Sequence, residues 1–282
     1  MHGNDVQHRN CFDSLAAMRD GGGVRLIVTS PPYPDARTPE QYGATFDTTL
    51  EGYGRLGDAV FEALVPGGVC ALNIDGPVRV WRPELGESER SLIAFEVALD
   101  WAKRVGFRYV EHCAYVRMGV PVSQGPRWRS GWEPLHVFAR PGSEPFFDRM
   151  GDSRPAKYAG DLISGKSRGR GVTDDVRAGE PRFNADRRSL TTSEHRPPMN
   201  GAADGEHAAI FSSSLADAFV LCYSQPGDLV GDPFVGSGTV AYSCHRHGRR
   251  FIGGDLGTRE RDGRAWADIV NDGLRQTSLD FG

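Results

Sequence analysis

The sequence predicts an α/β fold in which helices cover both faces of a doubly wound, Rossmann-like sheet. Segments with the composition of buried strands alternate with amphipathic segments of helical period along most of the chain. Two of the expected strands, at 24–29 and 227–231, are followed by loops rich in proline or glycine. Sheets of this kind bind ligands at the carboxyl ends of their strands, so both loops are candidates for one site.

The first buried strand is expected at 24–29, because a run of valine, leucine and isoleucine follows three consecutive glycines there. The remaining elements are expected, in chain order, as helices at 48–64 and 89–105, strands at 107–117, 135–140 and 227–231, a helix at 240–247 and a strand at 250–254. This alternation is what a doubly wound sheet requires.

The tetrapeptide Ser30-Pro31-Pro32-Tyr33 ends the first strand. Prolines cannot donate backbone hydrogen bonds, so we expect their carbonyl groups to point outward as fixed acceptors. Acceptors beside an aromatic ring suit a flat group that carries an NH2, whose protons are accepted while the ring stacks on its face. A proline-rich turn or a polyproline ligand would explain Pro-Pro-Tyr alone, but its place at a strand's carboxyl end favours a site.

The second loop is Asp232-Pro233-Phe234-Val235-Gly236-Ser237-Gly238-Thr239. Gly236 and Gly238 permit a tight turn close to a ligand, and Ser237 or Thr239 is expected to cap the next helix. Asp255, about 20 residues later, is placed to bind the hydroxyls of a ribose. No Gly-Lys-Ser/Thr follows, which excludes a Walker loop, and Asp232 would repel a pyrophosphate. We therefore expect an adenosine-bearing cofactor with a cationic end, with an NAD-binding oxidoreductase as the alternative, although that leaves Ser-Pro-Pro-Tyr unexplained.

Thr29 to Tyr33, followed late in the chain by Asp232 to Thr239, resembles the amino-group DNA methyltransferases that use S-adenosylmethionine, in the order of their β class. Leu64 to Ile74 is similar to the helix-turn-strand of that family, and Trp132 to Arg140 to its later Trp-Glu strand. His207 to Phe211 stands where the family often has His-Pro-Ala-x-Phe-Pro. The resemblance implies a mixed sheet of seven strands with a target-recognition insert.

The resemblance implies transfer of a methyl group to the exocyclic amino nitrogen of a cytosine that is flipped out of double-stranded DNA. Its catalytic residues would be Ser30, Pro31, Pro32 and Tyr33. Its cofactor-binding residues would be Asn10, Phe211, Asp232, Phe234, Gly236, Ser237, Gly238, Thr239 and Asp255. Asn10 lies in Arg9-Asn10-Cys11, where the family often has Gly-Asp-Cys, and would make a neutral form of the acid's contact with adenine.

A serine at position 30 is typical of family members that make N4-methylcytosine, whereas aspartate is typical of N6-adenine enzymes. Adenine remains the alternative base, RNA a weaker alternative substrate, and a DNA- or cofactor-binding module without turnover an alternative of another class. Methylation of the ring carbon is excluded, because that mechanism needs a Pro-Cys nucleophile and no cysteine of this chain follows a proline.

The chain divides, on this interpretation, into a catalytic part at 1–140, a target-recognition insert at 141–206 and a cofactor-binding part at 207–282. The middle segment is rich in glycine, proline, serine, arginine and aspartate, and has almost no apolar periodicity, so we expect it to be mobile or ordered by its ligand.

A net charge of −4 is unusual for a protein that binds DNA, but local distribution matters more than the sum. Arginines interleaved with aromatic residues are typical of a groove that follows a nucleic-acid strand. The candidates for DNA contact are Arg127, Trp128, Arg129, Lys166, Arg168 and Arg170. A cognate restriction enzyme as a further partner is left open, as is the choice between monomer and homodimer.

Five cysteines at scattered positions, with no segment apolar enough to cross a bilayer and no signal-peptide core, indicate a cytoplasmic protein. Cys244, His245 and His247 share one short helical stretch and lack Cys-x-x-Cys partners, so we expect no metal there.

Overall fold

The computed structural model describes residues 5–34, 46–76, 80–83, 86–116, 131–155, 188–189, 194–195, 212–259 and 261–279. The chain forms two compact units, Met1–Phe147 together with Ser193–Gly282, and Asp148–Thr192. In the smaller unit, β8 (Arg154–Pro155) and β9 (Arg188–Ser189) pair antiparallel. The division expected at residues 140 and 206 stays a prediction, because most of the segment between them lies outside the described residues.

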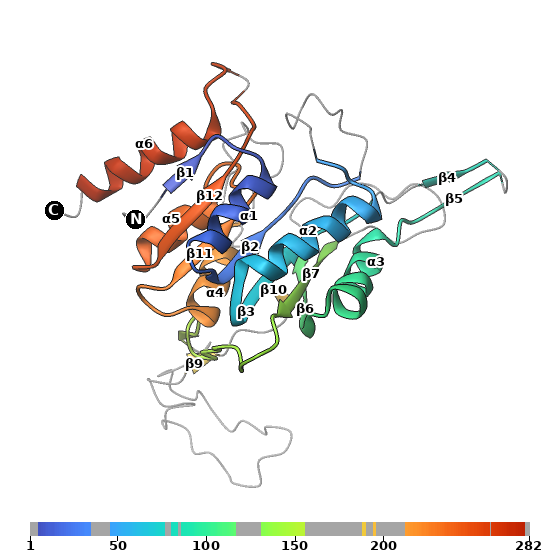
Figure 1. Ribbon diagram of the computed structural model, residues 1–282, viewed down its shortest axis with the longest axis horizontal. Coiled ribbons are helices and arrows are strands. Elements are labelled where there is room, and N and C mark those ends of the chain that lie inside the picture. The colour runs from blue at the N-terminus through green and yellow to red at the C-terminus, as the bar shows by residue number, and fades with distance from the viewer. Residues whose placement is uncertain are drawn as a thin grey trace, which may run out of the picture. The chain divides into compact units, whose positions relative to one another are not determined.

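A mixed sheet forms the centre of the larger unit (Figure 1). Its strands lie in the order β1 (Asp5–Gln7), β12 (Arg250–Gly254), β11 (Leu229–Asp232), β2 (Val24–Thr29), β3 (Leu64–Asn73), β7 (Trp132–Ala139), β6 (Arg108–Val116) and β10 (Glu194–His195). Strand β7 runs antiparallel to β3 and β6, and the other neighbouring pairs are parallel. The predicted mixed sheet of seven strands is confirmed, and the two-residue β10 extends it at one edge.

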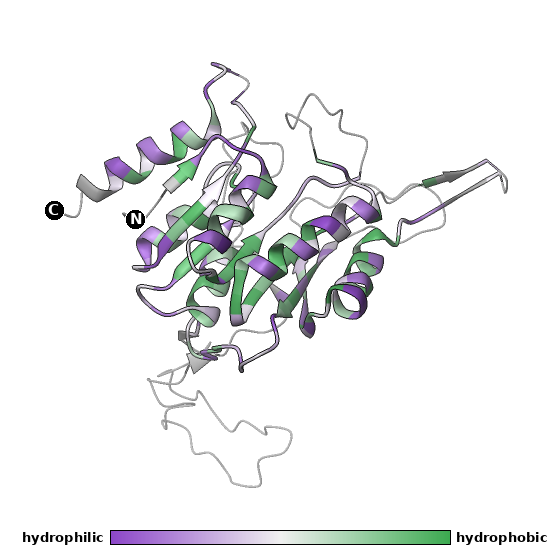
Figure 2. Cartoon of the chain, viewed as in Figure 1, coloured by the Kyte–Doolittle hydropathy of each residue, from purple (hydrophilic) through white to green (hydrophobic). Residues whose placement is uncertain are grey.

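Helices cover both faces of this sheet, and the hydrophobic core is accordingly divided in two. One face carries α1 (Cys11–Asp20), α2 (Leu50–Ala63), α3 (Ile93–Asp100) and the π-helical turn η2 (Trp101–Val105). The other carries α4 (Ser213–Tyr223), α5 (Thr239–Arg246) and α6 (Trp266–Leu279). The strands between these layers are strongly hydrophobic (Figure 2), as expected for parallel strands that are covered on both faces.

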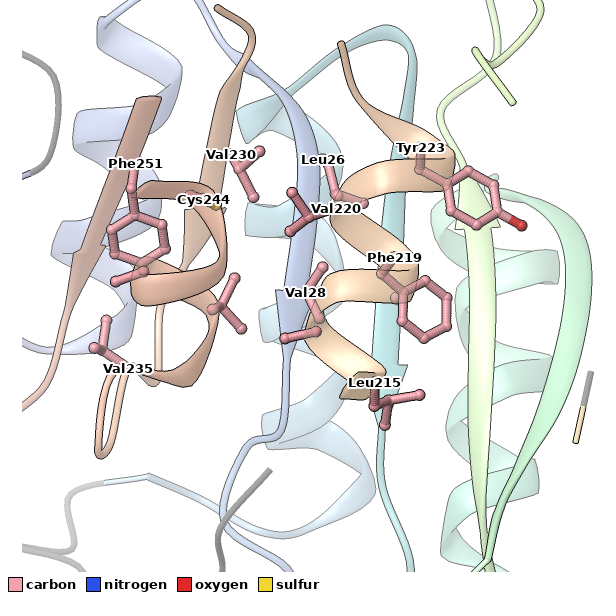
Figure 3. Packing of buried hydrophobic residues seen from close by; sticks show 14 of the residues in the cluster. Leu26, Val28, Leu215, Phe219, Val220, Tyr223, Val230, Val235, Cys244 and Phe251 are labelled. Atoms are coloured by element: carbon pink, nitrogen blue, oxygen red, sulfur yellow. The ribbon is translucent and has the colours of Figure 1, made fainter. Parts of the chain in front are cut away.

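Strand β2 contributes side chains to both hydrophobic cores. Leu26 and Val28 pack toward α4 and α5, whereas Val24 and Ile27 pack toward α1 and α2. Figure 3 shows the first of these cores, with side chains of α4 and α5 packed over β2 and β11. Burial on both sides explains why 24–29 has an almost continuous apolar sequence, and the strand predicted there is confirmed.

Several predicted elements differ from the structure at their ends. The helix expected at 89–105 begins only at Ile93, because Glu87–Glu89 form β5, which pairs with β4 (Val80–Arg82). The strand expected at 227–231 is Leu229–Asp232, since Gly227 has a positive φ of 85° and belongs to the preceding turn. Strand β1 was not predicted, because three residues are too few to show a period.

Helix α2 is anchored by Trp101, a fully buried side chain whose Nε1 donates to the Tyr53 carbonyl oxygen at 2.9 Å. The Tyr53 hydroxyl in turn donates to the carbonyl oxygen of Pro32 at 2.5 Å. The position of α2 therefore sets the position of the Ser-Pro-Pro-Tyr loop.

Within the described residues, no helix has the length and apolar character required to cross a membrane.

Substitutions of two glycines in α2 test whether packing against Trp101 holds this helix in place. A Cβ at Gly57 would lie 2.5 Å from Trp101 Nε1, whereas a Cβ at Gly54 would meet the flexible end of Arg104 at 3.0 Å. We expect Gly57→Ala to lower the free energy of unfolding by about 1–3 kcal/mol through overpacking. Gly54→Ala, the matched control, should be neutral or stabilising by about 0.5–1 kcal/mol. Urea unfolding measures both, and equal shifts would contradict the anchoring role.

Candidate active site

A cavity of about 510 Å³ lies where β2 and β11 end, and both predicted loops line it. This volume is in the usual range for a cofactor site. The predicted residues that line it are Asn10, Ser30, Pro31, Pro32, Tyr33, Asp232, Phe234, Gly236, Ser237, Thr239 and Asp255. Phe211 and the six candidates for DNA contact, Arg127, Trp128, Arg129, Lys166, Arg168 and Arg170, lie outside the described residues.

The two loops are joined by a buried hydrogen bond. Thr29, the last residue of β2, donates from Oγ1 to Asp232 Oδ1 at 2.7 Å, and the Phe234 backbone N–H donates to the same oxygen at 3.0 Å. Burial raises the pKa of Asp232 to about 7, and the nearby charge of Asp255 adds to the effect, while these two hydrogen bonds oppose it. Asp232 is therefore a buried carboxyl group that titrates near neutrality.

The Ser-Pro-Pro-Tyr loop differs from its prediction at Pro32. Its carbonyl oxygen does not point outward as an unused acceptor, because it accepts the hydrogen bond from Tyr53. The carbonyl of Pro31 has no hydrogen-bond partner among the described residues. Ser30 Oγ donates to the Tyr33 hydroxyl at 3.4 Å, so its lone pairs stay available. Ser30 and the Pro31 carbonyl are therefore the acceptors that the loop keeps for a ligand.

Tyr33 is held by two residues that the sequence did not indicate. Its hydroxyl lies 2.8 Å from Glu133 Oε2 and 3.1 Å from Asn73 Oδ1. A phenol has one proton to donate, and the shorter contact makes Glu133 the main acceptor. Burial, together with the negative charge of Glu133, raises the pKa of Tyr33 well above its ordinary value. The hydroxyl therefore remains protonated and donates to Glu133.

Asn73 and Glu133 come from neighbouring strands, β3 and β7, which pair antiparallel. The polar residue at the end of the buried strand 64–73 and the acid beside Trp132 were visible in the sequence. Only the pairing of these strands places both beside Tyr33, so neither could be assigned from local pattern.

In the glycine loop, Gly236 and Gly238 have positive φ angles of 51° and 87°, as the predicted tight turn requires. The predicted cap is wrong, however: Gly238 is the N-cap of α5 and no side chain caps the helix. The Gly238 carbonyl accepts from the Tyr242 N–H at 2.9 Å, which is the first hydrogen bond of the helix. Ser237 and Thr239 line the cavity instead.

Asp255 is oriented by two backbone donors. Gly236 N–H donates to Oδ2 at 2.8 Å and Gly257 N–H donates to Oδ1 at 2.6 Å. An ionised carboxylate has about four acceptor positions, so about two remain for the hydroxyls of a ligand. The expected contact with a ribose stays a prediction.

The Asn10 side chain spends most of its hydrogen-bonding groups on α1, the helix that it precedes. As the N-cap of α1 it accepts from the Asp13 backbone N–H at 2.9 Å, and its Nδ2 donates to Asp13 Oδ2 at 2.7 Å. One amide hydrogen is left for a ligand, so its expected contact with adenine also stays a prediction.

Comparison with known proteins decides the family. Residues 24–262 match the model of the N6/N4 family, described as DNA methylase. The chain belongs to this family. It is a DNA methyltransferase of the N6/N4 type.

Relatives of this DNA methylase span most of its length. The type II methyltransferase M.Cfr9I of Citrobacter freundii is 42% identical over 271 residues, which cover 86% of this chain and 81% of the relative. The orphan methyltransferase M.BamHII of Bacillus amyloliquefaciens is 26% identical over 260 residues, 89% of each chain.

Solved structures share the fold of the DNA methylase. The PvuII DNA methyltransferase, described as cytosine-N4-specific, has a TM-score of 0.62 at 15% identity, and the match covers 97% of this chain and 94% of that one. A putative DNA modification methylase of Thermus thermophilus, TTHA0409, complexed with S-adenosylmethionine, has a TM-score of 0.58 at 22% identity, with 97% and 93% covered. The predicted Rossmann-like methyltransferase fold is confirmed.

The raised pKa of Asp232 predicts a pH-dependent preference for the charged cofactor. A sulfonium ion near this carboxyl group favours its ionised form, so ionisation and binding are linked. From about pH 6 to about pH 8, the affinity for S-adenosylmethionine relative to S-adenosylhomocysteine, whose sulfur is uncharged, should rise by up to about tenfold. Calorimetric titration of both ligands measures this ratio.

Asp232→Asn is the control, because its Oδ1 still accepts from Thr29 and Phe234 while the charge is removed. In this variant, the ratio of the affinities for S-adenosylmethionine and S-adenosylhomocysteine should be independent of pH. An equal pH dependence in both proteins would contradict the assignment to Asp232.

Proposed function

We propose that this chain transfers a methyl group from S-adenosylmethionine to the exocyclic N4 of a cytosine in double-stranded DNA. The observation that carries the proposal is that Ser30, a neutral hydroxyl acceptor, lines the same cavity as Asp232 and the glycine loop. A base amine held at Ser30 would thus lie next to a methyl donor held at Asp232. M.Cfr9I, the relative at 42% identity, is named a type II methyltransferase, which supports site-specific modification of DNA.

The cavity fits the cofactor by the chemistry of its donors and acceptors. The carboxyl group of Asp232 suits a cationic sulfur, and the two remaining acceptor positions of Asp255 suit ribose hydroxyls. Two donor nitrogens of Arg9 are buried without a partner among the described residues and suit an acceptor of the ligand. When bound, S-adenosylmethionine would supply an electrophilic methyl group on a positively charged sulfur.

The protein's task is to make a weak nucleophile attack that methyl group. The lone pair of an exocyclic amine is delocalised into the base, so the nitrogen is poorly nucleophilic. Hydrogen bonds from the NH2 to Ser30 Oγ and the Pro31 carbonyl would draw the nitrogen toward tetrahedral geometry and localise the lone pair. Positioning and polarisation of this kind would supply the rate. The N–C bond would form as the S–C bond breaks, a neutral thioether would leave, and the surplus proton of the nitrogen would pass to water.

Tyr33 would stack on the base, which must leave the duplex to reach a cavity at this depth. The hydrogen bond from its hydroxyl to Glu133 fixes the position of the hydroxyl end of the ring before the base arrives. Such preorganisation reduces the entropy lost on binding.

Substitutions at Tyr33 separate stacking from the hydrogen bond. Tyr33→Ala removes the ring and should lower kcat/KM by about tenfold to a hundredfold, as expected for loss of a base-stacking contact. Tyr33→Phe keeps the ring and loses only the hydroxyl with its contacts to Glu133, Asn73 and Ser30, so kcat/KM should fall by about threefold to tenfold. Single-turnover kinetics on a duplex substrate measures both. Full activity of the alanine variant, or equal losses in the two, would contradict the stacking role.

Mass spectrometry of nucleosides tests the proposed reaction. Unmethylated DNA is incubated with the protein and S-adenosylmethionine that carries a trideuterated methyl group, so that new methylation is distinguished by mass. We expect labelled N4-methylcytosine from the wild-type chain and a strong loss with Ser30→Ala. Labelled N6-methyladenine would overturn the choice of base and keep the mechanism. No labelled nucleoside, with cofactor binding shown separately, would contradict the proposed reaction.

A further inference from the structure

Arg9 carries buried donors that the folded chain does not satisfy. It follows β1 and lines the cavity, and its Nε and Nη2 atoms are buried without a hydrogen-bond partner in the part of the chain that the structure describes. Gly254 permits this packing, since a Cβ there would lie 2.8 Å from Arg9 Cγ. Leaving a charged donor buried and unpaired is costly, and such groups in native proteins usually have a ligand or water as partner.

The order of strands indicates which part of the cofactor would reach Arg9. Strands β1, β12, β11 and β2 are parallel neighbours in this order, so the residues at their carboxyl ends are arranged in the same order. Arg9 follows β1, Asp255 follows β12, Asp232 ends β11 and Ser30 follows β2. On the proposed function, the methyl group must face Ser30 and the ribose must lie near Asp255. The adenine, on the other side of the ribose, then falls at Arg9.

The chemistry of the ligand agrees with this placement. A guanidinium group can only donate, and it repels a sulfonium ion. The adenine ring offers nitrogen acceptors at N1, N3 and N7, whereas its exocyclic amine is a donor. Asn10 and Asp13 also line the cavity, but they bond to each other at the start of α1, where Asn10 uses most of its amide as the cap. We propose that Arg9 is a positioning residue which donates a hydrogen bond from its guanidinium group to a ring nitrogen of the cofactor's adenine.

A double-mutant cycle between protein and ligand tests the proposal without requiring methyl transfer. Calorimetry compares S-adenosylhomocysteine with its 1-deaza, 3-deaza and 7-deaza analogues, each of which replaces one ring nitrogen by C–H. Arg9→Met should weaken binding of S-adenosylhomocysteine by about tenfold to a hundredfold. One analogue should bind the wild-type chain more weakly by a comparable factor, and Arg9→Met should add no further loss for that analogue.

Arg19→Met is the matched control. Arg19 lies on the exposed side of α1 and pairs with Asp20 at 3.0 Å and Glu62 at 3.2 Å, so its removal should leave binding unchanged. Thermal unfolding without ligand separates positioning from a structural role. Because the wild-type donors are unpaired, Arg9→Met should be at least as stable as the wild type in the absence of cofactor.

Three results would overturn the proposal: unchanged binding by Arg9→Met, equal binding of all four ligands by the wild type, or the same loss with every analogue in both proteins. Marked destabilisation of Arg9→Met without ligand would assign Arg9 to the fold instead. Failure of the wild-type chain to bind S-adenosylhomocysteine would contradict the cofactor cavity itself. Methylation of adenine rather than cytosine would leave the result for Arg9 intact.

Discussion

The buried hydrogen bond between Thr29 and Asp232 is the contact on which the arrangement of the site depends. It joins residues 203 positions apart in the sequence, at the carboxyl ends of the adjacent strands β2 and β11. From these two strands the chain winds outward in opposite directions, through β3 on one side and β12 on the other. Such a switch point is where open α/β sheets bind ligands, and the hydrogen bond holds the Ser-Pro-Pro-Tyr loop and the glycine loop together at one cavity.

Charge is distributed along the cavity in a way that matches the proposed cofactor. Carboxyl groups lie at Asp232 and Asp255, and unpaired guanidinium donors lie at Arg9. A ligand with a cation at one end of its adenosine and acceptor nitrogens at the other would satisfy all three, whereas a pyrophosphate would meet two carboxylates. Glu133 and Asn73 hold Tyr33 by its hydroxyl. Each half of the site is thus organised before its ligand binds.

The central strands and both loops could be predicted from the sequence, because local conformation determines them. The apolar run at 24–29 forms a strand, and the glycines at 236 and 238 adopt the positive φ angles of a tight turn. Features that depend on contacts between distant parts of the chain could not be predicted from the sequence. The Tyr53 hydroxyl donates to the Pro32 carbonyl, α5 starts at Gly238 without a side-chain cap, and Glu133 reaches Tyr33 only through the antiparallel pairing of β7. No role was predicted for Arg9 beyond its place in Arg9-Asn10-Cys11, because the sequence does not show whether a buried donor has a hydrogen-bond partner. The roles of Asn10 and Asp255 toward a ligand remain predictions.

The most direct test of this account is a crystal structure of the chain with S-adenosylhomocysteine bound. We predict that the sulfur lies between Asp232 and Ser30, that the ribose hydroxyls meet Asp255, and that the adenine edge meets Arg9. The Thr29–Asp232 hydrogen bond should be retained. A cofactor bound in the reverse direction, with its adenine at Ser30, or bound outside this cavity, would contradict both the proposed mechanism and the assignment of Arg9.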